Sequence, residues 1–126
     1  MNVPSMLGVA KYKSVQVTTS SPGQVLMMLF DGLFRFMDEA ADAIRKGERA
    51  RAGERISRAH AIVDELCSSL RPDHAPELCA KLQPLYIWAM GRLVEANASQ
   101  SAEAVDEVIK VLTPIREAFR QVTKGG

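Results

Sequence analysis

The segment that says most about this chain is SPGQVLMMLFDGLFRFMDEAADAIRK, residues 21–46. Ser21 is a good N-cap for a helix, Pro22 suits the first turn, and Gln24 lies three residues after the cap. From there the Gln24 side chain reaches back to the backbone N–H of the cap. We therefore expect a helix that begins at Pro22 and ends near Lys46.

The apolar residues of this segment fall on two neighbouring helical faces rather than one. Steps of three and four residues, typical of a core-facing helix, join Leu26, Leu29, Leu33, Phe36, Ala40 and Ile44. The second face carries Met27, Phe30, Phe34, Met37 and Ala41. A helix of a simple bundle needs only one wide apolar face. The excess must therefore be covered by another part of the chain, by a second subunit or by a partner peptide.

Length and composition indicate one domain with its own core. The chain has 126 residues, 47% of them hydrophobic, which is too short for two domains of ordinary size. A formal net charge of +1 disfavours nucleic-acid binding. Cys67 and Cys79 lack metal-ligand spacing, so we expect reduced thiols. With neither a secretory signal nor an apolar run long enough to span a bilayer, we expect a cytosolic protein without membrane insertion.

Residues 1–20 show no helical period and predict an irregular, flexible N-terminal arm. The arm carries more apolar residues than a freely solvated tail tolerates. These residues are Met6, Leu7, Val9, Tyr12, Val15 and Val17. We expect the arm to pack on the body at least part of the time.

Four amphipathic patterns predict helices at about residues 22–46, 51–70, 76–97 and 102–122. The connections between them are short, and short connections make consecutive helices antiparallel neighbours. Over residues 21–124 we therefore expect an all-α fold, an antiparallel up-down four-helix bundle.

Two prolines lie inside the predicted third and fourth helices. A proline removes a backbone donor and presses on the carbonyl four residues before it, at a cost of about 3 kcal/mol or more. We expect Pro84 to kink or break its helix and Pro114 to re-aim the last part of its helix.

His60 raises the alternative of phosphotransfer, because phosphorelay domains are four-helix bundles with a helix-borne histidine. Such domains place a lysine three residues after the histidine and a glycine at the next position, where this chain has Val63 and Asp64. An aspartate one turn from the nucleophile would repel a phosphoryl dianion. A histidine at the edge of the core is therefore the preferred interpretation, and a phosphotransfer module is the less favoured one.

The other polar residues do not form a recognisable catalytic or metal site. His74 lies in a loop with Asp73 and Glu77 nearby, whereas a metal ion needs convergent ligands. The sequence offers no nucleophile-base pair and no Gly-rich phosphate loop. We therefore predict a protein that is not an enzyme and that uses no metal or other cofactor.

A surplus of methionine and aromatic side chains indicates a partner. Methionine-rich surfaces adapt to a partner helix, although any single methionine can instead fill a gap in the core. Together with the second apolar face of the first helix, the surplus favours a peptide-binding groove. The residues predicted to contribute to it are Met27, Phe34, Met37, Tyr86, Trp88 and Met90.

In order and spacing, the motifs from Tyr12 to about Phe119 resemble the FliS family of flagellin export chaperones. The elements are Tyr12, Ser21-Pro22, the block Met28-Leu29-Phe30-Asp31-Gly32, Arg35-Phe36, Leu82 with Leu85 and Tyr86, Ala96-Asn97, and Glu107-Val108 with Leu112, Arg116 and Phe119. The chain departs from the family at Phe30, where a tyrosine is usual, and at Phe119, where a tryptophan is frequent.

The resemblance implies an antiparallel helical bundle in the bacterial cytosol that binds the disordered, apolar C-terminal segment of flagellin. Binding would prevent early polymerisation and present flagellin to a component of the flagellar export gate. The resemblance also implies that the N-terminal arm, with Tyr12, lies over the binding surface until flagellin displaces it. The resemblance leaves open whether a flagellar regulatory protein is a further partner. A helical secretion chaperone for another appendage protein is the alternative.

Overall fold

The computed structural model describes residues 21–125, and the arm expected over residues 1–20 lies outside this range. The described residues form four helices and no strand: α2 (Pro22–Arg45), α3 (Arg49–Ser68), α4 (Pro76–Ser99) and α5 (Ala102–Gly125). The predicted all-α four-helix bundle is confirmed. None of these four helices is both long and apolar enough to cross a membrane.

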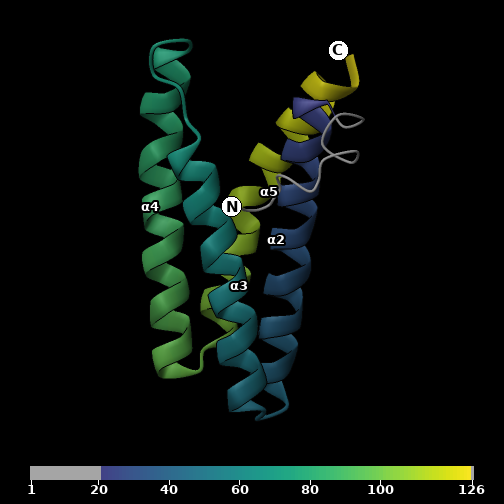
Figure 1. The fold of residues 1–126 in the computed structure, drawn as a ribbon. Coiled ribbons are helices and arrows are strands. Elements are labelled where there is room, and N and C mark those ends of the chain that lie inside the picture. The colour runs from purple at the N-terminus through teal and green to yellow at the C-terminus, as the bar shows by residue number, and fades with distance from the viewer. Residues whose placement is uncertain (1–20, 126) are drawn as a thin grey trace, which may run out of the picture.

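The helices run up and down in turn, and each packs on two neighbours (Figure 1). Helix α2 contacts α3 and α5, and α4 contacts the same two helices from the other side. The start of α2, the end of α5 and the loop between α3 and α4 lie at one end of the bundle. The two shorter turns, α2–α3 and α4–α5, lie at the other end.

The first helix begins as its sequence predicts. The backbone N–H of Gln24 donates to Ser21 Oγ at 3.1 Å, and the backbone N–H of Ser21 donates to Gln24 Oε1 at 2.9 Å. This capping box satisfies two backbone donors that the helix itself leaves unpaired. At the far end, Gly47 takes a φ of +73°, a left-handed conformation that glycine adopts without steric cost.

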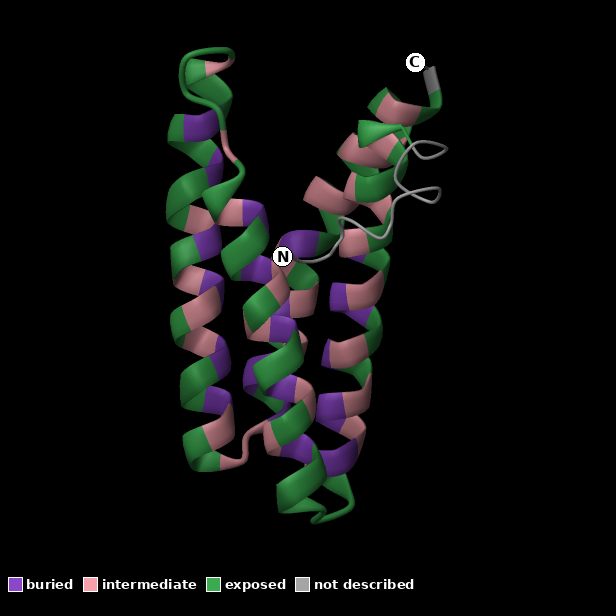
Figure 2. Ribbon diagram, viewed as in Figure 1, coloured by how far each residue is buried: buried purple, intermediate pink, exposed green. Residues whose placement is uncertain are grey.

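Both apolar faces of α2 are used inside the chain. Phe30, Leu33 and Met37 are fully buried, while residues on the flanks such as Leu29 and Phe36 pack half-buried against the core. On the α5 side the two helices approach closely, since a Cβ placed on Gly23 would lie 3.1 Å from Thr123 Cγ2. On the α3 side, a Cβ placed on Gly32 would lie 3.5 Å from Ile62 Cδ1. Helices α3 and α5 therefore cover the excess apolar surface, which explains why α2 needs two faces (Figure 2).

Neither proline breaks its helix. Helix α4 continues through Pro84 and α5 through Pro114. Both prolines lie on exposed positions, and so do Ala80 and Lys110, four residues before them. The carbonyls that lose a helical partner therefore belong to exposed residues, where water can supply the missing donor. The break expected as one outcome at Pro84 does not occur.

The capping box gives a prediction about stability. Replacing Ser21 by Ala removes the side-chain acceptor for the Gln24 N–H, so the free energy of unfolding should fall by about 1 kcal/mol. Urea unfolding followed by far-UV circular dichroism measures this change. The control is Ser57→Ala, at an exposed position in the middle of α3, where alanine should leave stability equal or slightly higher. Equal losses in the two variants would contradict the assigned role of the cap.

Candidate functional site

The core does not extend to the end of the bundle where α2 begins and α5 ends, which we call the open end. Among the described residues, none of α2 before Phe30 and none of α5 after Leu112 is buried (Figure 2). Apolar side chains nevertheless continue into this end and are only half-buried. They include Leu26, Met27, Leu29, Ile115 and Phe119. The open end therefore presents apolar surface that the described chain leaves uncovered.

A groove of about 300 Å³ runs between α4 and α5 at the open end, and we call it the α4/α5 groove. No charged side chain lines it. Its residues are Leu78, Leu82, Pro114, Ile115, Ala118, Phe119 and Val122. Leu78 is 46% exposed and Val122 is 70% exposed, so two large apolar side chains at the groove are in contact with water. Such a groove accepts apolar side chains of a partner.

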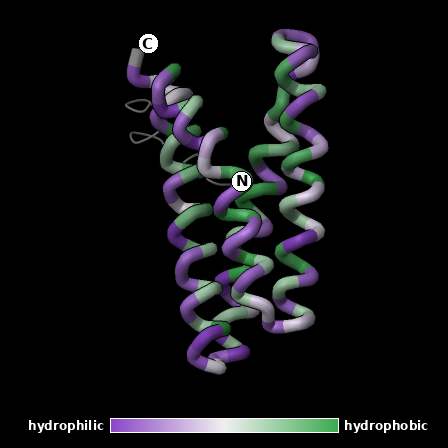
Figure 3. Tube along the Cα trace, turned by 180° about the vertical axis from the view of Figure 1, so that it is seen from behind, coloured by the Kyte–Doolittle hydropathy of each residue, from purple (hydrophilic) through white to green (hydrophobic). Residues whose placement is uncertain are grey.

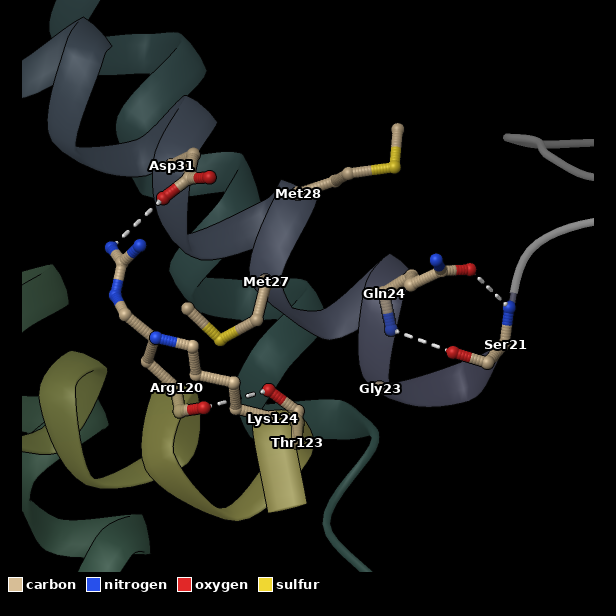
Figure 4. A pocket seen from close by; sticks show the side chains of 9 residues that line it. All are labelled: Ser21, Gly23, Gln24, Met27, Met28, Asp31, Arg120, Thr123 and Lys124. Carbon is tan, nitrogen blue, oxygen red and sulfur yellow. Dashed lines mark hydrogen bonds and ion pairs between the residues drawn. The ribbon is translucent and has the colours of Figure 1, made fainter. Parts of the chain in front are cut away.

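A second pocket, of about 610 Å³, lies on the other side of α5, against the first turns of α2, and we call it the α2/α5 pocket (Figure 4). Its lining is mixed. The Met27 side chain points toward α5, Met28 points away from it, and the Asp31 carboxylate faces Arg120. Asp31 Oδ1 and Arg120 Nη2 are 3.6 Å apart. Because charged groups line this pocket, it is less suited to an apolar partner than the α4/α5 groove.

Asp31 also joins α2 to α5 through a second arginine. Arg116 donates from Nη2 to Asp31 Oδ1 at 2.6 Å, and its guanidinium carbon lies 4.6 Å from the centre of the Phe34 ring. The Arg116 side chain is 25% exposed, which weakens the screening of both interactions by water. This residue therefore fixes the C-terminal half of α5 on α2.

Phe119 connects the groove to the core. Its ring stacks on Phe30, with ring centres 5.7 Å apart and an angle of 28° between the planes. Phe30 is fully buried, whereas Phe119 is half-buried and lines the α4/α5 groove. Aromatic pairs of this geometry add about 0.5–1.5 kcal/mol beyond their burial. The wall of the groove is thus attached to a rigid part of the bundle.

The structure does not gather the residues predicted for the binding groove into one surface. Tyr12 lies outside the described residues. Phe34, Met37 and Tyr86 are core residues, and Met27 lines the α2/α5 pocket. Trp88 and Met90 are half-buried on α4 and pack against the core. A role for these seven residues in partner binding stays a prediction.

Sequence reasoning placed the groove residues differently. Ile115, Phe119 and Val122 continue the regular period of α5, which predicts the core, and Leu78 lies off the main face of α4. The period is correct, but the last turns of α5 lack a complete set of neighbours. The apolar period carries no signal of this, because it does not show which helices cover the last turns of α5.

The two histidines have unremarkable surroundings. His60 is half-buried on α3, and His74 is exposed in the α3–α4 loop, 3.4 Å from Arg71 Nη2. Within residues 21–125, no three His, Cys, Asp or Glu side chains come together in a way that would hold a metal ion. Cys67 and Cys79 are free thiols.

Comparisons with known proteins identify the family of this chain. The family model described as "Flagellar protein FliS" matches residues 6–126. The chain belongs to the FliS family. A relative from Salmonella typhimurium, named "Flagellar secretion chaperone FliS", is 32% identical over 121 residues, 92% of this chain and 90% of the relative. Relatives of the same name from Bacillus subtilis and Campylobacter jejuni are 32% and 31% identical, over 87% and 88% of this chain and 81% and 87% of theirs.

Membership of the FliS family confirms the resemblance seen in the sequence. The motif residues are also in contact in the fold: Asp31 of the Asp-Gly element pairs with Arg116, and Phe30 stacks on Phe119. The two aromatic departures from the family pattern are therefore partners in one stack. Phenylalanine at both positions retains the apolar contact and lacks only the polar group of tyrosine or tryptophan.

The Asp31–Arg116 pair gives a prediction about the attachment of α5. In a double-mutant cycle with Asp31→Asn and Arg116→Met, the coupling energy should be about 0.5–1 kcal/mol, because the pair is partly shielded from water. It should decrease as salt is added. The exposed pair Glu54–Arg58, one turn apart on α3, is the matched control. The assigned role is wrong if the coupling across the helices is no larger than that of the control.

Tyr86 gives a prediction about pH. Burial, with a smaller contribution from the nearby Cys67 thiol, raises the pKa of Tyr86 from 10.0 to about 12. Between these values the unfolded state loses the phenol proton and the folded state keeps it, so the free energy of unfolding should fall as pH rises from 10 to 12. The loss approaches about 2–3 kcal/mol at the upper limit. Urea unfolding across this range measures it, and Tyr86→Phe should remove this part of the decline. An identical decline in the variant would contradict the burial of an intact phenol.

Proposed function

We propose that this FliS-family protein is a cytosolic export chaperone that binds the disordered C-terminal segment of flagellin in the α4/α5 groove. Binding there would prevent premature polymerisation and assist type III flagellar export. The observation that carries the proposal is the uncharged groove with Leu78 and Val122 exposed beside it. Relatives of this protein are named flagellar secretion chaperones, which supports a flagellar protein as the client.

The dimensions of the groove favour a short amphipathic helix. On α5 the lining runs from Pro114 to Val122, which is about 12 Å at 1.5 Å per residue. A partner helix of two to three turns would cover this length with apolar side chains at positions i, i+3 or i+4, and i+7. A segment that is disordered before binding loses conformational entropy on folding, and burial of these anchors offsets that loss.

The N-terminal arm belongs to the proposal as a competitor. Residues 1–20 join the described chain at Ser21, at the open end (Figure 1). The arm, with Tyr12, would lie over the exposed apolar residues until flagellin displaces it. A component of the export gate would receive the complex, and a flagellar regulatory protein is a further proposed partner.

Residues predicted earlier for the binding surface take two roles in the proposal. Met27, half-buried at the open end, would extend the contact area on the α2 side. Phe34, Met37 and Tyr86 would support the groove from within the core, because less than a tenth of each is exposed. Trp88 and Met90 lie further along α4 and would contact a client only if it continued beyond the groove.

The proposal predicts tight binding of a peptide that covers the C-terminal segment of flagellin from the same organism. Calorimetric titration should give a negative heat-capacity change, because apolar surface is buried, and circular dichroism should show added helix. Val122→Ser should weaken binding about tenfold, since burying one valine side chain contributes about 1.5 kcal/mol. The thermal stability of the free protein should not change, because Val122 is largely exposed.

The matched control is Val94→Ser, which makes the same replacement at an exposed position of α4 outside the groove. This variant should bind the peptide like the wild-type protein. Equal weakening by both variants would contradict the location of the site. Absence of binding by the wild-type protein would contradict flagellin as the client and favour a secretion chaperone for another appendage protein.

A further inference from the structure

Helix α4 is apolar on two opposite sides. One side faces the core and carries Cys79, Leu82, Tyr86, Ala89, Leu93 and Ala96, all of them buried. The opposite side carries a second series of uncharged, mostly apolar residues, all of them exposed: Ala80, Pro84, Ile87, Gly91, Val94 and Ala98. We call this series the outer face of α4. Figure 3 shows hydrophobic residues recurring along the length of this helix.

The outer face has no covering among the described residues. Ile87 is 55% exposed and Val94 is 57% exposed. A Cβ placed on Gly91 would meet no atom within 4 Å. The six positions follow each other at alternating steps of four and three residues, which is the spacing of a coiled-coil seam. A bundle that ended at four helices would place charged residues there.

We propose that the outer face of α4 binds the same face of a second copy of this chain, with the two α4 helices antiparallel about a two-fold axis near Ala89. In this arrangement each exposed apolar residue faces another. Ala80 faces Ala98 of the second copy, Pro84 faces its Val94, and Ile87 faces its Gly91. The small residues allow the two backbones to approach closely.

The residues beside the seam are complementary in this arrangement and fix its register. In an antiparallel pair of helices the same flank of each helix meets. On one flank Lys81 faces Glu95 of the second copy, and the symmetry makes this pair twice. On the other flank Gln83 faces Asn97 of the second copy. A parallel pair, or a shift by one heptad, separates the opposite charges and shortens the seam.

The fold prepares these flanking residues for contact. Lys81 is exposed and makes no ion pair within residues 21–125, and the Glu95 side chain is 67% exposed. Arg92 lies 3.1 Å from Glu95 and donates to Glu107 of α5 at 2.7 Å, which orients Glu95 without burying it. A Cβ placed on Gly53 of α3 would lie 3.6 Å from the Asn97 side chain. The two flanks therefore border α5 and α3.

The seam is short and separate from the α4/α5 groove. From Ala80 to Ala98 it extends about 27 Å at 1.5 Å per residue, which is a small interface and implies a weak dimer at micromolar concentrations. Leu78 and Leu82 lie on another side of α4, so the α4/α5 groove of each copy stays open in the dimer. The inference does not depend on flagellin being the client.

Charge-exchange variants test the register directly. Sedimentation equilibrium of the full chain should show a concentration-dependent monomer–dimer equilibrium at low salt. Lys81→Glu or Glu95→Lys alone sets like charges against each other twice and should raise the dissociation constant at least tenfold. An equimolar mixture of the two variants restores both attractive pairs, so heterodimers should form. The double variant should dimerise like the wild-type protein. A failure to recover association in both the mixture and the double variant would overturn the antiparallel register.

A second variant separates association from folding. Gly91→Lys should leave the monomer folded, because the added side chain projects into open space and lysine favours helix over glycine. It should abolish the dimer by placing a charge in the seam. Trp88, the single tryptophan, lies beside the seam and should shift its fluorescence to shorter wavelength as the wild-type protein associates.

The groove variant Val122→Ser should associate normally, whereas Val94→Ser should not. This contrast makes a failure of the dimer distinguishable from a failure of peptide binding. A wild-type protein that stays monomeric at all accessible concentrations would overturn the proposal, and residues 1–20 or a client segment would then be the occupant of the outer face. Loss of peptide binding in Val94→Ser would also overturn the proposal.

Discussion

The packing of α5 against α2 is the contact on which the rest of the structure depends. It joins residues far apart in the sequence, through Arg116 with Asp31 and through Phe119 with Phe30. These contacts lie in the C-terminal half of α5 and hold it on α2. The same half-helix is therefore only partly covered on its α4 side, where Leu78 and Val122 remain exposed. The open end is a consequence of which neighbour α5 contacts most closely.

The fold was predictable because its determinants are local. The apolar period and the Ser21 cap specify where helices lie, and short connections leave one simple topology. The predicted third helix, residues 76–97, corresponds to α4, which extends to Ser99 because Gln100 closes it in a left-handed conformation with φ 52°. The break considered at Pro84 did not occur, because the carbonyl freed by the proline lies on the exposed side. Periodicity alone does not reveal that water can supply the donor that the proline removes.

The site was less predictable because exposure depends on neighbours and not on residue type. Met37 looked like a surplus apolar residue when α2 was given one apolar face, yet α2 has two helical neighbours and the core accommodates it. Tyr86 looked like surplus as well, yet it lies on the core side of α4 and is buried. Val122 looked like core because it keeps the period of α5, yet no helix covers it. Which apolar residues stay exposed is decided by long-range packing, and a single sequence carries little information about that.

The two apolar surfaces of α4 differ in what surrounds them, and this difference indicates what each one recognises. The α4/α5 groove has no charged lining, so it imposes few constraints on register and suits a disordered apolar segment. The outer face is bordered by Lys81, Glu95 and two amide side chains at defined heptad positions. Polar residues beside an apolar seam discriminate between registers by penalising mismatched pairs. An apolar groove without such residues favours adaptable client binding, whereas a seam with them favours a partner whose sequence is fixed, and a second copy of the same helix satisfies that condition.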